Sequence, residues 1–270
     1  MRNVLAVAGV VLRCWARRKE GYILVVLRAA AQYARASMQV LASGGPGLYL
    51  YDVGLLLTWF LGWIVAIHVG ASELPGEESH GTIFLLLAKP LDRAELLVGK
   101  WLGAWTTVAA CTLAFHAVAL ASALLTGVHP PLAAMGQMCL LHIVSLAVLT
   151  AMAIAVSTRF NRDAAVSLTV TAVLAMFLIV PKIPKFIVTA AGWRAGMFEA
   201  LYYALPHLDL FDMRRRVLHG YGPISGGTFL TLVGYGAVWA GVLLFIAWLA
   251  YRRRRFQRCL LAQCSAGQDF

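Results

Sequence analysis

The sequence predicts an all-α, polytopic membrane protein with six transmembrane helices. Three observations lead to this fold class: the composition, the length of the apolar segments, and the positions of the basic residues. Apolar residues make up 61% of the chain and charged residues only 13%, with a mean hydropathy of +0.76. Soluble domains usually carry about 25% charged residues. The composition therefore excludes an ordinary soluble domain.

Long apolar segments define the expected spans. A helix needs about 20 mostly apolar residues to cross the hydrocarbon core. Five segments meet this length, and a sixth is weaker because Arg28 and Arg35 interrupt it. The six expected spans are residues 21–40, 53–71, 101–125, 134–156, 164–180 and 229–250. Together they predict one membrane domain, residues 1–250, followed by a basic cytoplasmic tail, residues 251–270.

Residues 4–12 are apolar but too short to cross a membrane, and a basic cluster follows them. This pattern is typical of an amphipathic helix that lies in the membrane interface. The cluster comprises Arg13, Arg17, Arg18 and Lys19. Because basic loops stay in the cytoplasm, it marks the first inside face.

The remaining loops alternate in basic content. Residues 42–52 and 126–133 contain no Lys or Arg, whereas residues 89–100, 159–162 and 252–258 do. This alternation predicts six spans with both termini in the cytoplasm. The long loop 181–226 should lie outside although it is basic, and its aromatic content predicts short helices at the outer interface.

The formal net charge of +11 does not indicate a nucleic-acid partner. The basic residues stand at the ends of apolar segments, as orientation signals do, so the expected surroundings are membrane lipids. The five cysteines are scattered without CxxC spacing and predict neither disulfides nor a zinc site.

The stretch "ELPGEESHGTIFLLLAKPLDR", residues 73–93, is the most polar part of the first half of the chain. Pro75 suits the first turn of a helix, and Glu77 and Glu78 would then lie where the helix dipole favours carboxylates. Pro90 would end this helix, and Asp92 would cap the next one. The pattern predicts a short, two-faced helix at the cytoplasmic surface between the second and third spans, or an ordinary surface helix there.

The same residues resemble a known family. Glu78, the pair Gly81–Thr82, "LLLAKPLDR" and "GKWLGAW" look like the signature of type-2 ABC transporter permeases. "RRKEGY", "STRFNRDAA" and "LPHLDLFDMRRRVLHG" look like further landmarks of this family. The likeness extends over residues 17–251, and it is nearest to the six-span group that contains the nitrous-oxide-reductase maturation permease.

The resemblance implies a transmembrane subunit that pairs with a second permease chain, identical or different, and with cytoplasmic ABC ATPase subunits. In such permeases the first cytoplasmic loop is a coupling helix seated in a groove of the ATPase. The residues that would form or flank this contact are Glu77, Glu78, Gly81, Thr82, Lys89, Pro90, Arg93 and Lys100.

The chain itself lacks the phosphate-binding loop of an ATPase, G-x-x-x-x-G-K-[ST]. Its only Gly-Lys pair, Gly99–Lys100, precedes Trp101 and has Ala94 at the upstream glycine position. We therefore expect a non-enzymatic chain without a cofactor of its own, and ATP with Mg²⁺ on a partner subunit.

A polar face is expected on the first span, because Arg28, Gln32, Arg35 and Gln39 follow helical spacing. Such residues usually face a bundle interior or a water-filled cavity, which favours a translocation path for an anionic or headgroup-bearing substrate. Two alternatives remain open. The arginines could extend to the interface, or they could pair with Asp52 or Glu20.

Sulfur and imidazole side chains gather on the third and fourth spans. This set comprises Cys111, His116, Met135, Met138, Cys139 and His142. These groups suit a soft metal such as Cu(I), but methionine, cysteine and hydrogen-bonded histidine are also ordinary packing residues in spans. We assign no metal site to them.

The function expected from these observations is that of the permease subunit of an ATP-driven exporter. One alternative is a membrane scaffold or assembly factor without transport. A secondary transporter would need carboxylates near mid-depth, and the expected spans contain almost none.

Overall fold

The computed structural model describes residues 2–17, 47–79, 92–125, 127–189 and 192–252. Every regular element in these ranges is helical. The long helices are α3 (Gly47–Ser79), α5 (Arg93–Leu125), α6 (Leu132–Ser157), α7 (Arg162–Ile179) and α11 (Gly226–Arg252). The short elements are α1 (Arg2–Arg17), η1 (Val180–Lys182), α8 (Ile183–Thr189), α9 (Trp193–Ala204), η2 (Leu208–Phe211) and α10 (Arg214–Leu218).

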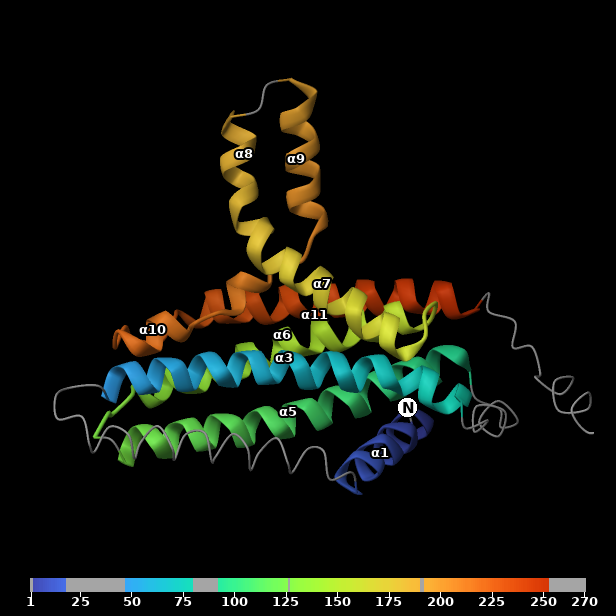
Figure 1. Cartoon of the computed structure of the whole chain (residues 1–270), viewed down its shortest axis with the longest axis horizontal. Coiled ribbons are helices and arrows are strands. Elements are labelled where there is room, and N and C mark those ends of the chain that lie inside the picture. The colour runs from blue at the N-terminus through green and yellow to red at the C-terminus, as the bar shows by residue number, and fades with distance from the viewer. Residues whose placement is uncertain (1, 18–46, 80–91, 126, 190–191, 253–270) are drawn as a thin grey trace, which may run out of the picture.

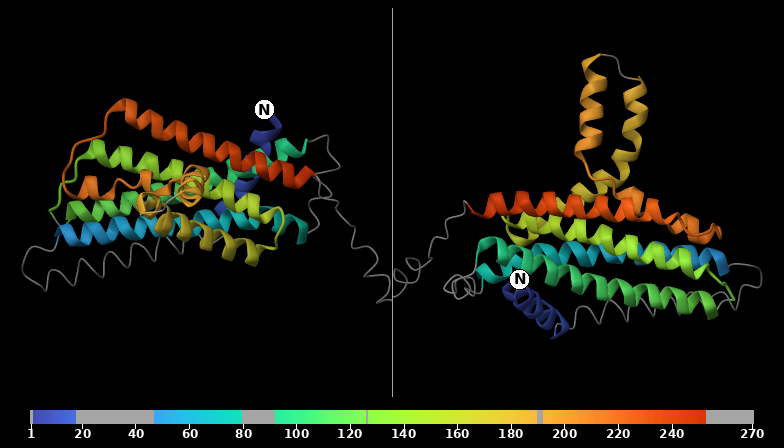
Figure 2. Two further views of the ribbon diagram at one scale, coloured as in Figure 1. Left: turned by 90° about the horizontal axis from the view of Figure 1, so that it is seen from above. Right: turned by 180° about the vertical axis from the view of Figure 1, so that it is seen from behind.

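Helices α3, α5, α6 and α11 lie side by side along the long axis of the molecule (Figures 1 and 2). At one end, which we call the Arg93 end, α3 and α11 finish and α5 begins at Arg93. At the other end, the Tyr51 end, α5 finishes and α6 begins. These two names are used for the two ends below.

Five helices in the described ranges are long and apolar enough to cross a membrane. They contain the five stronger spans expected from the sequence, and the protein is a multi-pass helical membrane protein. The sixth expected span, residues 21–40, lies outside the described residues.

Helix α6 forms the centre of the bundle and packs against α3, α5, α7 and α11. In the most apolar stretch of α6, 67% of the residues are buried, against 17% for α11. The exposed side chains of α11 include Leu230, Val238 and Phe245. Because these residues are apolar, they suit contact with lipid tails or another span.

Helix α1 packs against the first half of α5, where two glycines leave room for it. A Cβ atom at Gly99 would lie 2.8 Å from Val7 Cβ, and one at Gly103 would lie 2.6 Å from Val11 Cβ. The short apolar N-terminal segment is helical and rests on the motif "GKWLGAW", while its place in the membrane interface stays a prediction.

The loop 181–226 is largely helical, as its aromatic content predicts, and it has two different parts. Helices α8 and α9 form a hairpin that stands out sideways from the bundle, which we call the arm (Figure 1). The stacked rings of Phe186 and Phe198 join its two helices, with 6.0 Å between centroids. Residues 208–217 instead return to the bundle, where Leu208, Phe211 and Val217 are buried in the core.

One expectation about helix boundaries is wrong. Pro75 was expected in the first turn of a separate helix, but α3 continues through Pro75 to Ser79. A proline inside a helix removes one backbone hydrogen bond. The helix persists because Leu74 is fully buried and the neighbouring Glu73 is paired with Lys100. The next helix does begin directly after Asp92, as predicted.

Candidate functional site

The candidate site is the Arg93 end of the bundle, where α3 and α5 flank the stretch expected to bind a motor. Glu77 and Glu78 belong to the last turn of α3, and Arg93 is the first residue of α5. The motif residues between the two helices, Gly81, Thr82, Lys89 and Pro90, lie outside the described residues. The structure therefore brings two ends of the expected coupling stretch to the same end of the bundle.

Lys100 forms an ion pair with Glu73 across the two helices. Lys100 Nζ lies 3.0 Å from Glu73 Oε2, and both side chains are more than 90% buried. A buried charge needs a partner, because leaving it unpaired carries a large desolvation penalty. This pair therefore fixes the end of α3 against the beginning of α5. The sequence showed Lys100 but gave no sign that Glu73 would be its partner.

Arg93 reaches the last turn of α11. Its Nη1 donates hydrogen bonds to the backbone carbonyls of Arg252, at 2.8 Å, and Tyr251, at 3.3 Å. The final carbonyl groups of a helix lack donors within the helix, and the helix dipole favours a cation there. Arg93 thus joins α5 to a helix that ends about 160 residues later in the chain.

An apolar cluster supports these contacts. Leu74 of α3, Leu96 and Leu97 of α5 and Tyr251 of α11 are all buried in it, together with Val7 of α1. At the same end, Arg162 of α7 lies 3.0 Å from His68 Nε2 of α3. Helices α1, α3, α5, α7 and α11 are consequently connected around the candidate site.

The polar face expected on the first span, comprising Arg28, Gln32, Arg35 and Gln39, lies outside the described residues. Its proposed contact with the path stays a prediction.

The sulfur and imidazole set lies in the middle of the bundle and towards the Tyr51 end rather than at this site. His116 and His142 have ring centroids 5.4 Å apart, and Tyr51 Oη donates to Met135 Sδ over 3.7 Å. Cys111 and Cys139 are half-buried free thiols. In the described part of the chain, no three His, Cys, Asp or Glu residues are placed to hold a metal ion.

Sequence reasoning missed an aromatic cluster in this part of the core. His142 stacks on Trp59 with centroids 4.2 Å apart, and the Arg214 guanidinium lies 5.6 Å from the Trp59 ring centroid. Arg214 also pairs with Asp212 at 2.6 Å. Tryptophan at 59 and 63 in an apolar run gives no sequence signal for such a partner, because Arg214 lies in a distant loop.

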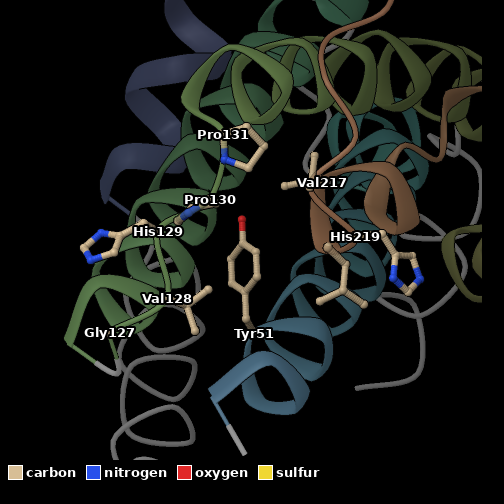
Figure 3. Close-up of a pocket in the computed structure, with 10 residues that line it drawn as sticks. Tyr51, Gly127, Val128, His129, Pro130, Pro131, Val217 and His219 are labelled. Atoms are coloured by element: carbon tan, nitrogen blue, oxygen red, sulfur yellow. The ribbon is translucent and has the colours of Figure 1, made fainter. Parts of the chain in front are cut away.

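A cavity of about 400 Å³ opens at the Tyr51 end. Its walls come from the turn at residues 127–131, from α10 and from the first turns of α3. Figure 3 shows the Tyr51 ring between that turn and Val217. The cavity is thus at the opposite end of the bundle from the candidate site.

A helical bundle of long apolar spans, with charged contacts gathered where the polar stretch joins two spans, defines a multi-pass membrane protein. The chain belongs to the ABC-2 family of transporter proteins, whose sequence profile matches residues 18–254. It is therefore a transmembrane subunit of an ABC transporter, as the resemblance in its motifs predicts.

A curated relative gives a shorter match. The chain is 42% identical over 66 residues to a probable ABC transporter permease protein, NosY, of Pseudomonas aeruginosa. The match spans about a quarter of each protein, 24% of this chain and 24% of the relative.

Proposed function

We propose that this chain is the permease subunit of an ATP-driven exporter in the bacterial inner membrane. It would work with cytoplasmic ABC ATPase subunits and a second permease chain, identical or different. ATP and Mg²⁺ would bind only to the ATPase subunits. Both termini would lie in the cytoplasm.

The observation that carries this proposal is the length of α3 and α5. Each has 33 residues, which corresponds to about 50 Å at 1.5 Å per residue. The hydrocarbon core is only about 30 Å thick. The ends of both helices therefore have enough length to extend beyond the membrane, with Glu77 and Glu78 on one of them and Arg93 on the other.

The mechanism we infer is mechanical. ATP-driven closure of the ATPase dimer would push the segment around residues 77–93. Because α3 and α5 are continuous helices from this segment into the membrane, they would pass the movement to the spans. The path between two permease chains would then change its access. The proposed lining of this path is the polar face of Arg28, Gln32, Arg35 and Gln39.

The direct experiment purifies the full chain with a candidate ABC ATPase subunit. We expect a stable complex in which the permease changes the ATPase rate. Reversing one charge, Glu78→Lys, should weaken association or the change in ATPase rate, because a carboxylate at the contact would become a cation. Glu199→Lys is the matched control, since Glu199 is an exposed carboxylate on α9 of the arm.

If Glu78→Lys leaves both association and ATPase rate unaltered, the coupling proposal fails. A scaffold or assembly factor is the remaining alternative. Such a protein would bind a partner without altering ATP hydrolysis, so the wild-type measurement separates the two functions.

A further inference from the structure

Arg93 and Lys100 were expected to form or flank the contact with the ATPase. In the structure, both side chains instead contact other helices of this chain. Arg93 binds backbone carbonyls of α11, and Lys100 binds Glu73 of α3. A residue whose purpose was to bind the ATPase surface would be exposed, yet the Lys100 side chain is only 6% exposed. The contacts of Arg93 and Lys100 therefore indicate a role other than binding the ATPase surface.

We propose that Glu73, Lys100 and Arg93 are positioning residues that tie both ends of the coupling segment to three spans at once. We call these three residues the clamp. This proposal rests on the proposed coupling function. It specifies which helices move when the ATPase pushes the coupling segment. Without the clamp a push would displace the ends of α3 and α5 alone. With it, α3, α5 and α11 move together.

The geometry supports a joint movement. The Glu73–Lys100 pair lies between the ends of α3 and α5, so neither helix end can slide along the other without separating two buried charges. Arg93 then adds α11, because a charge-assisted hydrogen bond holds the last turn of that helix. Ala247 and Tyr251 of α11 are buried in the apolar cluster at the same end, so the bond adds a directed polar contact to a helix end that is already packed against its neighbours.

Close packing of α1 completes the arrangement. Gly99, next to Lys100, lets the backbone of α1 approach α5, with Val4 O 3.0 Å from a Cβ built at that position. Val7 of α1 belongs to the same apolar cluster as Leu74 and Tyr251. The Glu73–Lys100 pair is therefore surrounded by tightly packed side chains, whereas the hydrogen bond from Arg93 to Arg252 lies at the exposed edge of the clamp.

The central experiment separates positioning from motor binding. The full chain is reconstituted with a candidate ABC ATPase subunit, and two quantities are measured: the Kd of the complex and the permease-dependent ATPase rate. Arg93→Ala should lower the rate about tenfold while Kd changes less than about twofold, since a charged hydrogen bond is lost away from the contact. Arg93→Lys should recover part of the rate.

Arg159→Ala is the matched control, because Arg159 is an exposed arginine in the turn between α6 and α7 at the same end. It should leave both quantities at their wild-type values. A parallel rise of Kd in Arg93→Ala would show that Arg93 contacts the motor and would overturn the proposal. An unchanged rate in Arg93→Ala would overturn it as well.

A second experiment uses the chain alone in detergent micelles and does not depend on any ATPase. Glu73→Lys and Lys100→Glu should each lower Tm, and the double swap should recover most of the loss, because the pair is restored with reversed polarity. Arg93→Ala should also speed amide exchange in the last turn of α11. If the swap recovers nothing and the exchange is unchanged, the clamp does not exist.

The two experiments distinguish the possible failures. A wild-type chain that neither binds nor alters the ATPase contradicts the proposed function, and the micelle experiment then decides the clamp by itself. A wild-type chain that does both, with a clamp that fails in micelles, contradicts only the present inference.

Discussion

At the Arg93 end, charged side chains of one helix bind atoms of another helix, whereas aromatic rings pack against one another in the middle of the bundle. At the Arg93 end, Glu73, Lys100 and Arg93 connect α3, α5 and α11. In the middle, Trp59 stacks on His142, and Trp63 meets Phe177 edge to face with centroids 5.1 Å apart. The Glu73–Lys100 pair and the Trp59–His142 stack are both buried, but the first depends on paired charges and the second on ring packing.

The difference concerns what each region can tolerate. A paired charge is stable only while its partner remains in place, so the Arg93 end holds the helices in one particular alignment. Stacked aromatic rings are stabilised by the apolar area that they bury, so they tolerate small shifts of one helix against another. We therefore expect substitutions that break a charged contact at the Arg93 end to lower both coupling and the free energy of unfolding, and ring-for-ring substitutions in the middle to change either quantity little.

The largest effect is expected from Glu73→Gln. It leaves the buried Lys100 ammonium without its carboxylate, and breaking a buried pair typically costs about 3–5 kcal/mol. Chemical unfolding of the chain in micelles measures the loss. Removing both charges, as Glu73→Gln with Lys100→Met, should cost less than the single change. A double variant that is less stable than Glu73→Gln would contradict the assignment of the pair.

A smaller loss is expected from Gly103→Val. The new side chain would meet Val11 Cβ at 2.6 Å and the Ala8 carbonyl at 2.9 Å, so α1 must move away from α5. Overpacking of this kind costs about 1–3 kcal/mol. Thermal unfolding and protease cleavage within α1 measure it. Gly136→Val is the control, because a Cβ at Gly136 has open space; an equal loss in both variants would exclude the close α1 contact.

Five of the six expected spans and the short helices of the long loop could be predicted from the sequence, because apolar length and aromatic content are local properties. The continuation of α3 past Pro75 could not. Local rules place a proline in the first turn of a helix, and only the burial of Leu74 against distant residues such as Ile154 overrides them.

The candidate site shows the same division. The motif identified Arg93 and Lys100, because they stand at fixed positions beside the polar stretch. Their partners could not be predicted, since Glu73 is one of several nearby carboxylates and the carbonyls of Tyr251 and Arg252 carry no sequence signature at all. The motif gives only the positions of residues along the chain. The orientation of each side chain depends on packing, which the motif does not specify.

A weak or stabilising effect is expected from His142→Phe in the aromatic middle. Among the described residues, neither ring nitrogen of His142 has a hydrogen-bond partner, although the side chain is fully buried. Phenylalanine keeps the stack on Trp59 and removes the unsatisfied polar atoms, which can be nearly neutral or stabilising.

His116→Phe is the matched comparison for this test. His116 Nδ1 donates to the Thr112 carbonyl at 2.9 Å, so its replacement loses a hydrogen bond worth about 1 kcal/mol. Unfolding in micelles should rank His142→Phe above His116→Phe in stability. The opposite order would mean that His142 makes a polar contact that matters for the fold.

The smallest effect is expected in the arm, and it extends the comparison to the two parts of one loop. Trp193 is 74% exposed, and no side chain of α9 is buried. Trp193→Ser should therefore change the free energy of unfolding of the isolated chain by less than about 0.5 kcal/mol.

Phe211 of the same loop is buried between α6 and α11, where its ring lies 3.3 Å from a Cβ built at Gly236. Phe211→Ala should cost about 3–5 kcal/mol, because it opens a cavity in the core. Equal losses in the two variants would mean that the arm also packs against the bundle. A loss for Phe211→Ala alone would assign the part of the loop that returns to the bundle to its folded core, and would leave the arm as an appendage that contributes little to folding.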